Sequence, residues 1–145
     1  MSYEAWGDGD EFDDGYRKVE DLLDAGWLDP ENLSKAMLDV VNERDRQVNE
    51  EHFDEAGDDG YVLGELAKAA ASYSTYAGVV AQLRLGRLND AEIAALAADA
   101  GVPPSWPWAP EWWKPVDQRR SLVKAAALLV AEIERLDRAE KAKAG

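Results

Sequence analysis

The segment from about residue 116 to beyond Arg138 constrains the fold most, because its hydrophobic pattern is that of one long helix. The centre of this segment, Ala125–Ala131, is apolar on every side of a helix. A helix that is apolar all round normally lies in the middle of a bundle. The run is also far shorter than the ~20 residues that cross a bilayer, so no membrane segment is expected. We therefore predict a long buried C-terminal helix in which Leu129 faces a packed core, and Leu129→Asp is expected to unfold the domain.

Earlier segments have apolar residues three and four positions apart, which is the period of an amphipathic helix. Asp29-Pro30 reads as a cap residue followed by proline at the first helical position. Gly86 is a stop signal, and Asn89 is a cap for a short helix. The predicted earlier helices cover residues 16–25, 30 to beyond 47, 61–85 and 90–100. Because no segment alternates like a strand, we predict an all-α, single-domain helical bundle over residues 16–145.

Residues 102–115 form a Pro/Trp-rich loop, because prolines interrupt any regular structure there. Four tryptophans lie in this loop, at positions 106, 108, 112 and 113. One interpretation is structural: large rings hold an irregular loop onto the core. A second is a stacking platform for a base or a peptide, with Lys114, Arg119 and Arg120 supplying positive charge. A third is that these arginines pair with the acidic first half of the same chain.

The charge distribution is strongly asymmetric. Residues 1–60 carry 20 acids and 5 bases, whereas the remaining 85 residues carry 10 acids and 11 bases. Such a first half is unsuited to binding a phosphate backbone, which needs clustered Lys and Arg. It suits a basic protein surface or cations better. The chain has no cysteine, which excludes disulfides, thiolate metal sites and a cysteine nucleophile.

Residues 1–15 carry six acids and no base, and we expect them to form a mobile acidic arm. The N-terminus lacks the basic-then-apolar order of a signal peptide, so a cytoplasmic location is expected. The only histidine, His52, lies among acids and is not expected to be catalytic. The residues predicted to bind a partner are Asp8, Asp10, Glu11, Asp13, Asp14, Glu50, Glu51, Asp54 and Glu55.

Several other charged residues have both a structural and a functional interpretation. Glu43, Gln47 and Glu50 share one helix face. This face is either solvated, with Glu43 paired to Arg46 or Gln47, or it converges with Glu65 on a cation. Lys124 and Glu132 flank the apolar segment and are each expected to meet a partner from another helix. Asp58-Asp59 is expected to form a turn and to cap the helix that follows.

From Asn42 onward, the chain resembles a group of small helical proteins encoded by bacteriophages and prophages, most of which have no assigned activity. The resemblance covers about half of the chain. The pieces that carry it are Glu43 to Gln47 (ERDRQ), Asp58-Asp59, Gly64 to Ala70 (GELAKAA), Trp106 to Trp108, Trp112 to Pro115, and Leu122 to Arg138, which ends in AEIERLDR. The resemblance implies a phage-type protein that works inside a bacterial host.

The first and last of these pieces are similar, more distantly, to MazG-like all-α nucleotide pyrophosphohydrolases. Those enzymes hold Mg²⁺ with carboxylates from two facing helices. Here Lys68 and Ala69 stand where two of those carboxylates would be, so the resemblance implies a degenerate metal site. The Mg²⁺ ligands that it implies are Glu43, Glu65, Glu134 and Asp137. The phosphate-binding residues would be Lys114, Arg119, Arg120 and Lys124.

Two functions therefore stand beside each other. The first is an acidic helical binding protein that needs no cofactor and occupies a basic surface of a host or nucleic-acid-handling protein. Such a protein would act as an inhibitor of anti-defence type and imitate nucleic acid. The alternative is the Mg²⁺-dependent pyrophosphohydrolase. A third interpretation is a structural or regulatory homodimer formed through the apolar last helix.

Overall fold

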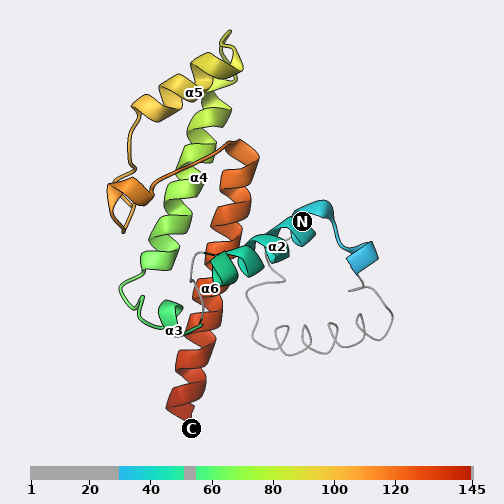
Figure 1. Cartoon of the computed structure of the whole chain (residues 1–145), viewed down its shortest axis with the longest axis vertical. Coiled ribbons are helices and arrows are strands. Elements are labelled where there is room, and N and C mark those ends of the chain that lie inside the picture. Colours follow the sequence, from blue (N-terminus) through green and yellow to red (C-terminus); the bar gives the residue numbers. More distant parts are fainter. Residues whose placement is uncertain (1–29, 51–54, 145) are drawn as a thin grey trace, which may run out of the picture. The chain divides into compact units, whose positions relative to one another are not determined.

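The computed structural model describes residues 30–50 and 55–144, and all regular structure in this part of the chain is helical. The all-α prediction is therefore confirmed. The described residues from Asp39 onward belong to one compact unit, and residues 30–38 belong to another. The helices are α2 (Lys35–Glu50), α3 (Glu55–Asp58), α4 (Glu65–Leu83), α5 (Asp90–Asp99) and α6 (Gln118–Ala144), with 3₁₀ turns at Pro30–Asn32 and Pro110–Trp112 (Figure 1).

The main core lies between α4 and α6, which run antiparallel side by side (Figure 1). Alanines dominate the contact on both helices, and small side chains let two helices approach closely. Leu66 is fully buried, and burial of a leucine contributes about 1.5–3 kcal/mol. The core residues are Leu66, Ala69, Ala70 and Tyr73 of α4, and Ala125, Leu128 and Ala131 of α6.

The opposite face of α6 is exposed, which corrects one prediction. Leu129 keeps 45% of its surface exposed, so it does not face a packed core. One side of α6 lies against α4, and α2 and α3 meet other positions of α6 through ion pairs, but the described residues leave Leu129 exposed. An apolar sequence on every face therefore did not mean burial on every face. Leu129→Asp is accordingly not expected to unfold the domain.

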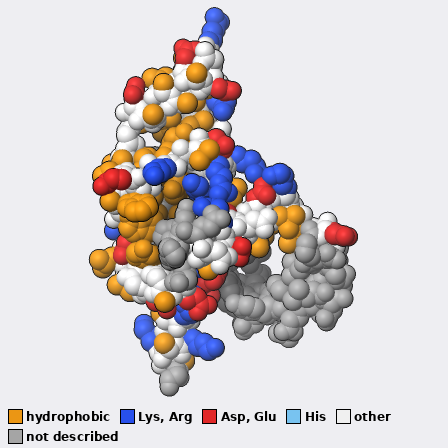
Figure 2. Space-filling view, in the orientation of Figure 1, with side chains coloured by type: hydrophobic (Ala, Val, Ile, Leu, Met, Phe, Trp, Pro, Cys, Tyr) orange, Lys and Arg blue, Asp and Glu red, His pale blue; other side chains and the backbone are white. Residues whose placement is uncertain are grey.

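The Pro/Trp-rich loop packs onto the α4–α6 core. Trp106, Trp108 and Trp113 lie against the core, and Tyr73 of α4 meets the Trp106 ring edge-on at 5.6 Å between centroids. Figure 2 shows hydrophobic side chains gathered over this loop and α4. Trp112, by contrast, is 70% exposed. The structural interpretation of the loop is confirmed for three of the four tryptophans.

The short helix α5 begins as predicted. The Asn89 side chain accepts a hydrogen bond from the Glu92 backbone N–H at 2.8 Å, and the Glu92 carboxylate accepts one from the Asn89 backbone N–H. This reciprocal pair is a capping box. A small second core of Val80, Ile93 and Ala97 joins α5 to the end of α4.

Two helices begin later than predicted. Residues 30–32 form a 3₁₀ turn, and α2 starts at Lys35, where Ser34 Oγ accepts a hydrogen bond from the Met37 backbone N–H at 3.2 Å. Helix α4 starts at Glu65 instead of Tyr61, because Gly64 adopts a left-handed φ of +83°. The expected helix over residues 16–25 and the acidic arm lie outside the described residues.

Candidate functional site

A buried carboxylate at the middle of α2 is the centre of the first charged cluster. The Glu43 side chain is fully buried, and both of its oxygens accept hydrogen bonds from Arg120 Nη2 of α6, at 2.6 and 2.8 Å. Arg46 Nε donates to the same carboxylate at 2.7 Å. Two guanidinium groups therefore compensate one buried negative charge, as a buried ion requires. The expected pairing of Glu43 with Arg46 is confirmed, but Glu43 does not lie on a solvated face, and Gln47 beside it is also buried.

This cluster lines a hollow of about 370 Å³. Arg119 reaches into the same region and donates to Asp39 of α2 at 2.8 Å. Arginines and carboxylates are balanced in number around the hollow, which is lined by Asp39, Asn42, Glu43, Arg46, Asp117, Arg119, Arg120 and Val123. The prediction that the α6 arginines pair with acids from the first half of the chain is confirmed.

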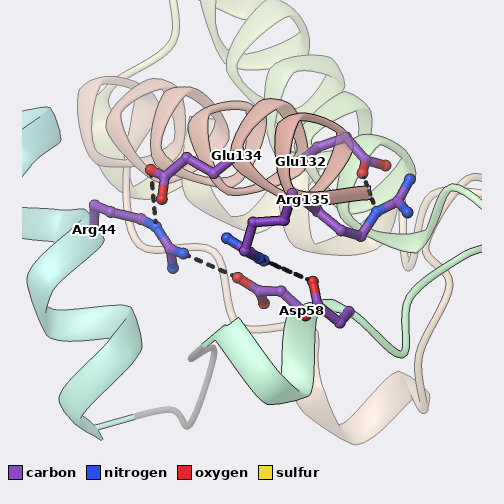
Figure 3. A network of polar contacts seen from close by, with 7 residues as sticks. Arg44, Asp58, Glu132, Glu134 and Arg135 are labelled. Atoms are coloured by element: carbon purple, nitrogen blue, oxygen red, sulfur yellow. Dashed lines mark hydrogen bonds and ion pairs between the residues drawn. The ribbon is translucent and has the colours of Figure 1, made fainter. Parts of the chain in front are cut away.

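A second cluster ties α3 to its neighbours (Figure 3). Arg44 of α2 donates to the fully buried Asp58 at 2.9 Å and lies 3.8 Å from Glu134 of α6. Asp59 accepts from Arg138 of α6 at 2.9 Å. Asp58 and Asp59 were expected to cap the following helix, but they instead hold α3 against α2 and α6 through arginines.

The residues that flank the apolar segment of α6 differ in their partners. Lys124 lies over the Tyr73 ring of α4, with Nζ 5.4 Å from the ring centroid, so it meets another helix as predicted. Glu132 pairs with Arg135 one turn later on its own helix, so that part of the prediction is wrong (Figure 3). A helix can supply its own counter-ion at i+3 without a second element.

The four carboxylates of the alternative magnesium site are not gathered in one place. Glu43 is held by two arginines, and Glu134 faces Arg44. Glu65 accepts a hydrogen bond from the Leu63 backbone N–H at 2.6 Å, at the start of its own helix. Asp137 is exposed on α6. Within residues 30–50 and 55–144, no three acidic or histidine side chains form a group that could hold a metal ion.

The alternative phosphate-binding residues are likewise not gathered into one cationic site. Arg119 and Arg120 are paired with acids, and Lys124 contacts a tyrosine ring. Lys114 is exposed at the end of the Pro/Trp-rich loop. A group of positive side chains available to bind phosphate is thus not assembled from these four residues.

Most of the residues predicted to bind a partner lie outside the described part of the chain. These are Asp8, Asp10, Glu11, Asp13, Asp14, Glu51 and Asp54, together with the side chain of Glu50; His52 also lies there. Glu55 is described: it is the first residue of α3 and is exposed. The prediction that these residues bind a partner stays a prediction.

The fold perturbs the ionisation of Tyr61. Its ring contacts Trp108 at 5.4 Å between centroids. Burial raises the pKa of Tyr61 above its usual 10.0, and the negative charges of Asp58 and Glu65 raise it further. The phenol therefore stays neutral beside two carboxylates that belong to α3 and α4.

Sequence reasoning missed that Glu43 and Asp58 are fully buried. The available signal was the spacing of Glu43, Arg44 and Gln47 in one short stretch of α2, since acids beside arginines can be buried when each charge has a partner. None of the helices in the described part is long and apolar enough to cross a membrane. No protein-family model, curated protein or solved structure matches the chain.

Proposed function

We propose that this chain is an acidic helical binding protein that occupies a basic surface on a host protein, of the kind that normally holds nucleic acid. The observation that supports this proposal is the internal use of arginine. Seven of the nine arginines of the chain form ion pairs with Asp or Glu in the described residues. Because each of these arginines already pairs with a carboxylate of the described residues, it does not neutralise the acids of the other segments.

The excess negative charge is concentrated in two segments. Residues 1–29 and 51–54 together carry twelve acids and two bases, which is ten of the net fourteen negative charges. A concentration of one sign of charge steers an oppositely charged partner toward it and makes binding sensitive to salt. The resemblance to small phage proteins supports a host protein as the partner.

The hydrolase alternative is less well supported by the described residues. A metal-dependent hydrolase needs carboxylates that converge on open positions around the ion. In the described part, the carboxylates that the MazG resemblance implies are spread over α2, α4 and α6, and Glu43 is already compensated by arginines. We therefore propose that the function depends on the acidic residues that attract a basic partner, and not on a metal site.

The experiment is capture of host proteins at low salt on the tagged full-length chain, followed by release with added duplex DNA. The test variant changes Asp10, Glu11, Asp13 and Asp14 to their amides. The control variant makes the same change at four exposed acids of the described part: Asp45, Asp90, Asp99 and Glu111. We expect the test variant to lose the captured proteins and the control to keep them. Equal capture by both variants would contradict a role for the arm, and proteins that duplex DNA cannot release would contradict nucleic-acid mimicry.

A second assay separates the alternative. Pyrophosphate release from NTPs and dNTPs is measured with Mg²⁺ or Mn²⁺ for the natural chain and for Glu65→Ala. We expect no turnover from either chain. Metal-dependent turnover that the substitution removes would overturn the binding proposal in favour of the hydrolase.

A further inference from the structure

Large apolar side chains form an exposed stripe along one face of α6. Leu122, Leu129, Ile133 and Leu136 are 48%, 45%, 58% and 52% exposed. With Ala126 they recur at intervals of four, three, four and three residues. This is the average period of 3.5 at which one helix presents a seam to a partner helix. We call these five residues the α6 stripe.

The stripe lies away from the core of the protein. Among the buried residues of α6, Ala125, Leu128 and Ala131 belong to the core with α4, and Val123 lines the hollow shared with α2. The α6 stripe occupies the remaining side of the helix: the described residues leave its four large side chains exposed, and Ala126 is half-buried. Exposed apolar residues that are contiguous, and not scattered singly, mark an interaction surface.

We propose that two copies of this chain pack antiparallel along the α6 stripe, with Leu129 on the two-fold axis. The stripe is almost symmetric about that residue, since Leu122 lies seven positions before it and Leu136 seven positions after it. An isologous interface requires such a pattern, because each residue must meet its counterpart on the reversed helix. Leu122 then meets Leu136 of the partner subunit, and the small Ala126 lies beside Ile133 of the partner subunit.

Charge favours the antiparallel direction. Asp137 follows Arg119 by 18 residues, which at 3.6 residues per turn is five turns, so both lie on the same flank of the stripe. An antiparallel pair brings Arg119 of one copy beside Asp137 of the partner subunit, twice in each dimer. Arg119 is half exposed, and its link to Asp39 uses one end of a guanidinium that has five N–H donors. A parallel pair would leave these charges at opposite ends, and its helix dipoles would be aligned unfavourably.

The absence of natural cysteine makes this register directly testable. Single cysteines are placed at Leu122, Leu129 and Leu136 of the full-length chain, which is then oxidised and run on a non-reducing gel. We expect Leu129→Cys to form disulfide dimers by itself. Leu122→Cys and Leu136→Cys should each run as single chains when oxidised alone, and should form a disulfide-linked dimer when the two variants are mixed. Leu85→Cys, on the exposed connection between α4 and α5, is the matched control and should not link.

Light scattering and circular dichroism complete the test. The natural chain should have twice the mass of one chain at high concentration, and Leu129→Glu should lose the dimer while keeping its helical content. A natural chain that is monomeric at every concentration would overturn the proposal. Coverage of the stripe by residues 1–29 would give this result. Self-linking at all three stripe positions would overturn the antiparallel register. The outcome of the dimer test does not depend on the capture experiment, because neither the α6 stripe nor the Leu85→Cys control lies in the acidic arm.

Discussion

Arg120 donates hydrogen bonds to both carboxylate oxygens of Glu43, from a position 77 residues away in the sequence. Arg46 holds the same carboxylate from its own helix. The pair joins α2 to the start of α6, at a place where the carboxylate has no access to solvent. Glu43 is therefore a structural counter-ion in the described part of the chain, and its removal tests that role.

Glu43→Ala is expected to lower the free energy of unfolding by about 3–5 kcal/mol, because it leaves two arginines facing a site without their anion. Urea unfolding followed by circular dichroism measures the change. Asp45→Ala is the matched control, since this exposed neighbour should change stability by less than about 0.5 kcal/mol. A Glu43→Ala chain as stable as the control would contradict the structural role.

Asp58 and Asp59 allow a comparison between adjacent carboxylates. Asp58 is fully buried against Arg44, whereas the Asp59 side chain is 52% exposed beside Arg138. We expect Asp58→Asn to cost roughly 3 kcal/mol, because Arg44 loses its buried partner. Asp59→Asn should cost less than about 1 kcal/mol, as is typical of exposed ion pairs. Equal costs in urea unfolding would contradict this difference in burial.

The helices themselves were largely predictable, because periodicity and punctuation are local. Asn89 correctly predicted the start of α5, and the prolines of residues 102–115 predicted the loop that the structure contains. The core was less predictable. The apolar centre of α6 indicated a buried helix, but periodicity does not say how many neighbours cover a helix, so Leu129 was misplaced. The ion pairs of Glu43 with Arg120 and of Asp58 with Arg44 join segments that are far apart in the sequence, so local periodicity does not reveal them.

The α4–α6 core can be tested at one leucine. Leu66 has no exposed surface, whereas Leu63, just before the helix, is 77% exposed. Leu66→Ala should lower the free energy of unfolding by about 2–5 kcal/mol, through lost burial and the cavity left among the alanines. Leu63→Ala should change it by less than about 0.5 kcal/mol. Similar losses in thermal or urea unfolding would contradict the assignment of Leu66 to the centre of the core.

The raised pKa of Tyr61 leads us to expect that the free energy of unfolding falls in alkaline solution. Burial and the nearby Asp58 and Glu65 raise its pKa in the folded chain above the 10.0 of an unperturbed phenol. Between these two pKa values the folded chain keeps the phenolic proton and the unfolded chain loses it, so stability falls as pH rises. The contribution is complete below 10.0 and is lost as the pH passes through the raised value.

Tyr61→Phe removes this ionisation while keeping the ring against Trp108. The measurement is the free energy of unfolding in urea for both chains, from neutral pH to above the usual tyrosine pKa. The two chains differ only in this hydroxyl, so the difference between the curves isolates Tyr61. We expect the natural chain to lose more stability than Tyr61→Phe over the alkaline range. Parallel curves would show that the fold does not hold this phenol neutral, and would place its hydroxyl in water, away from Asp58 and Glu65.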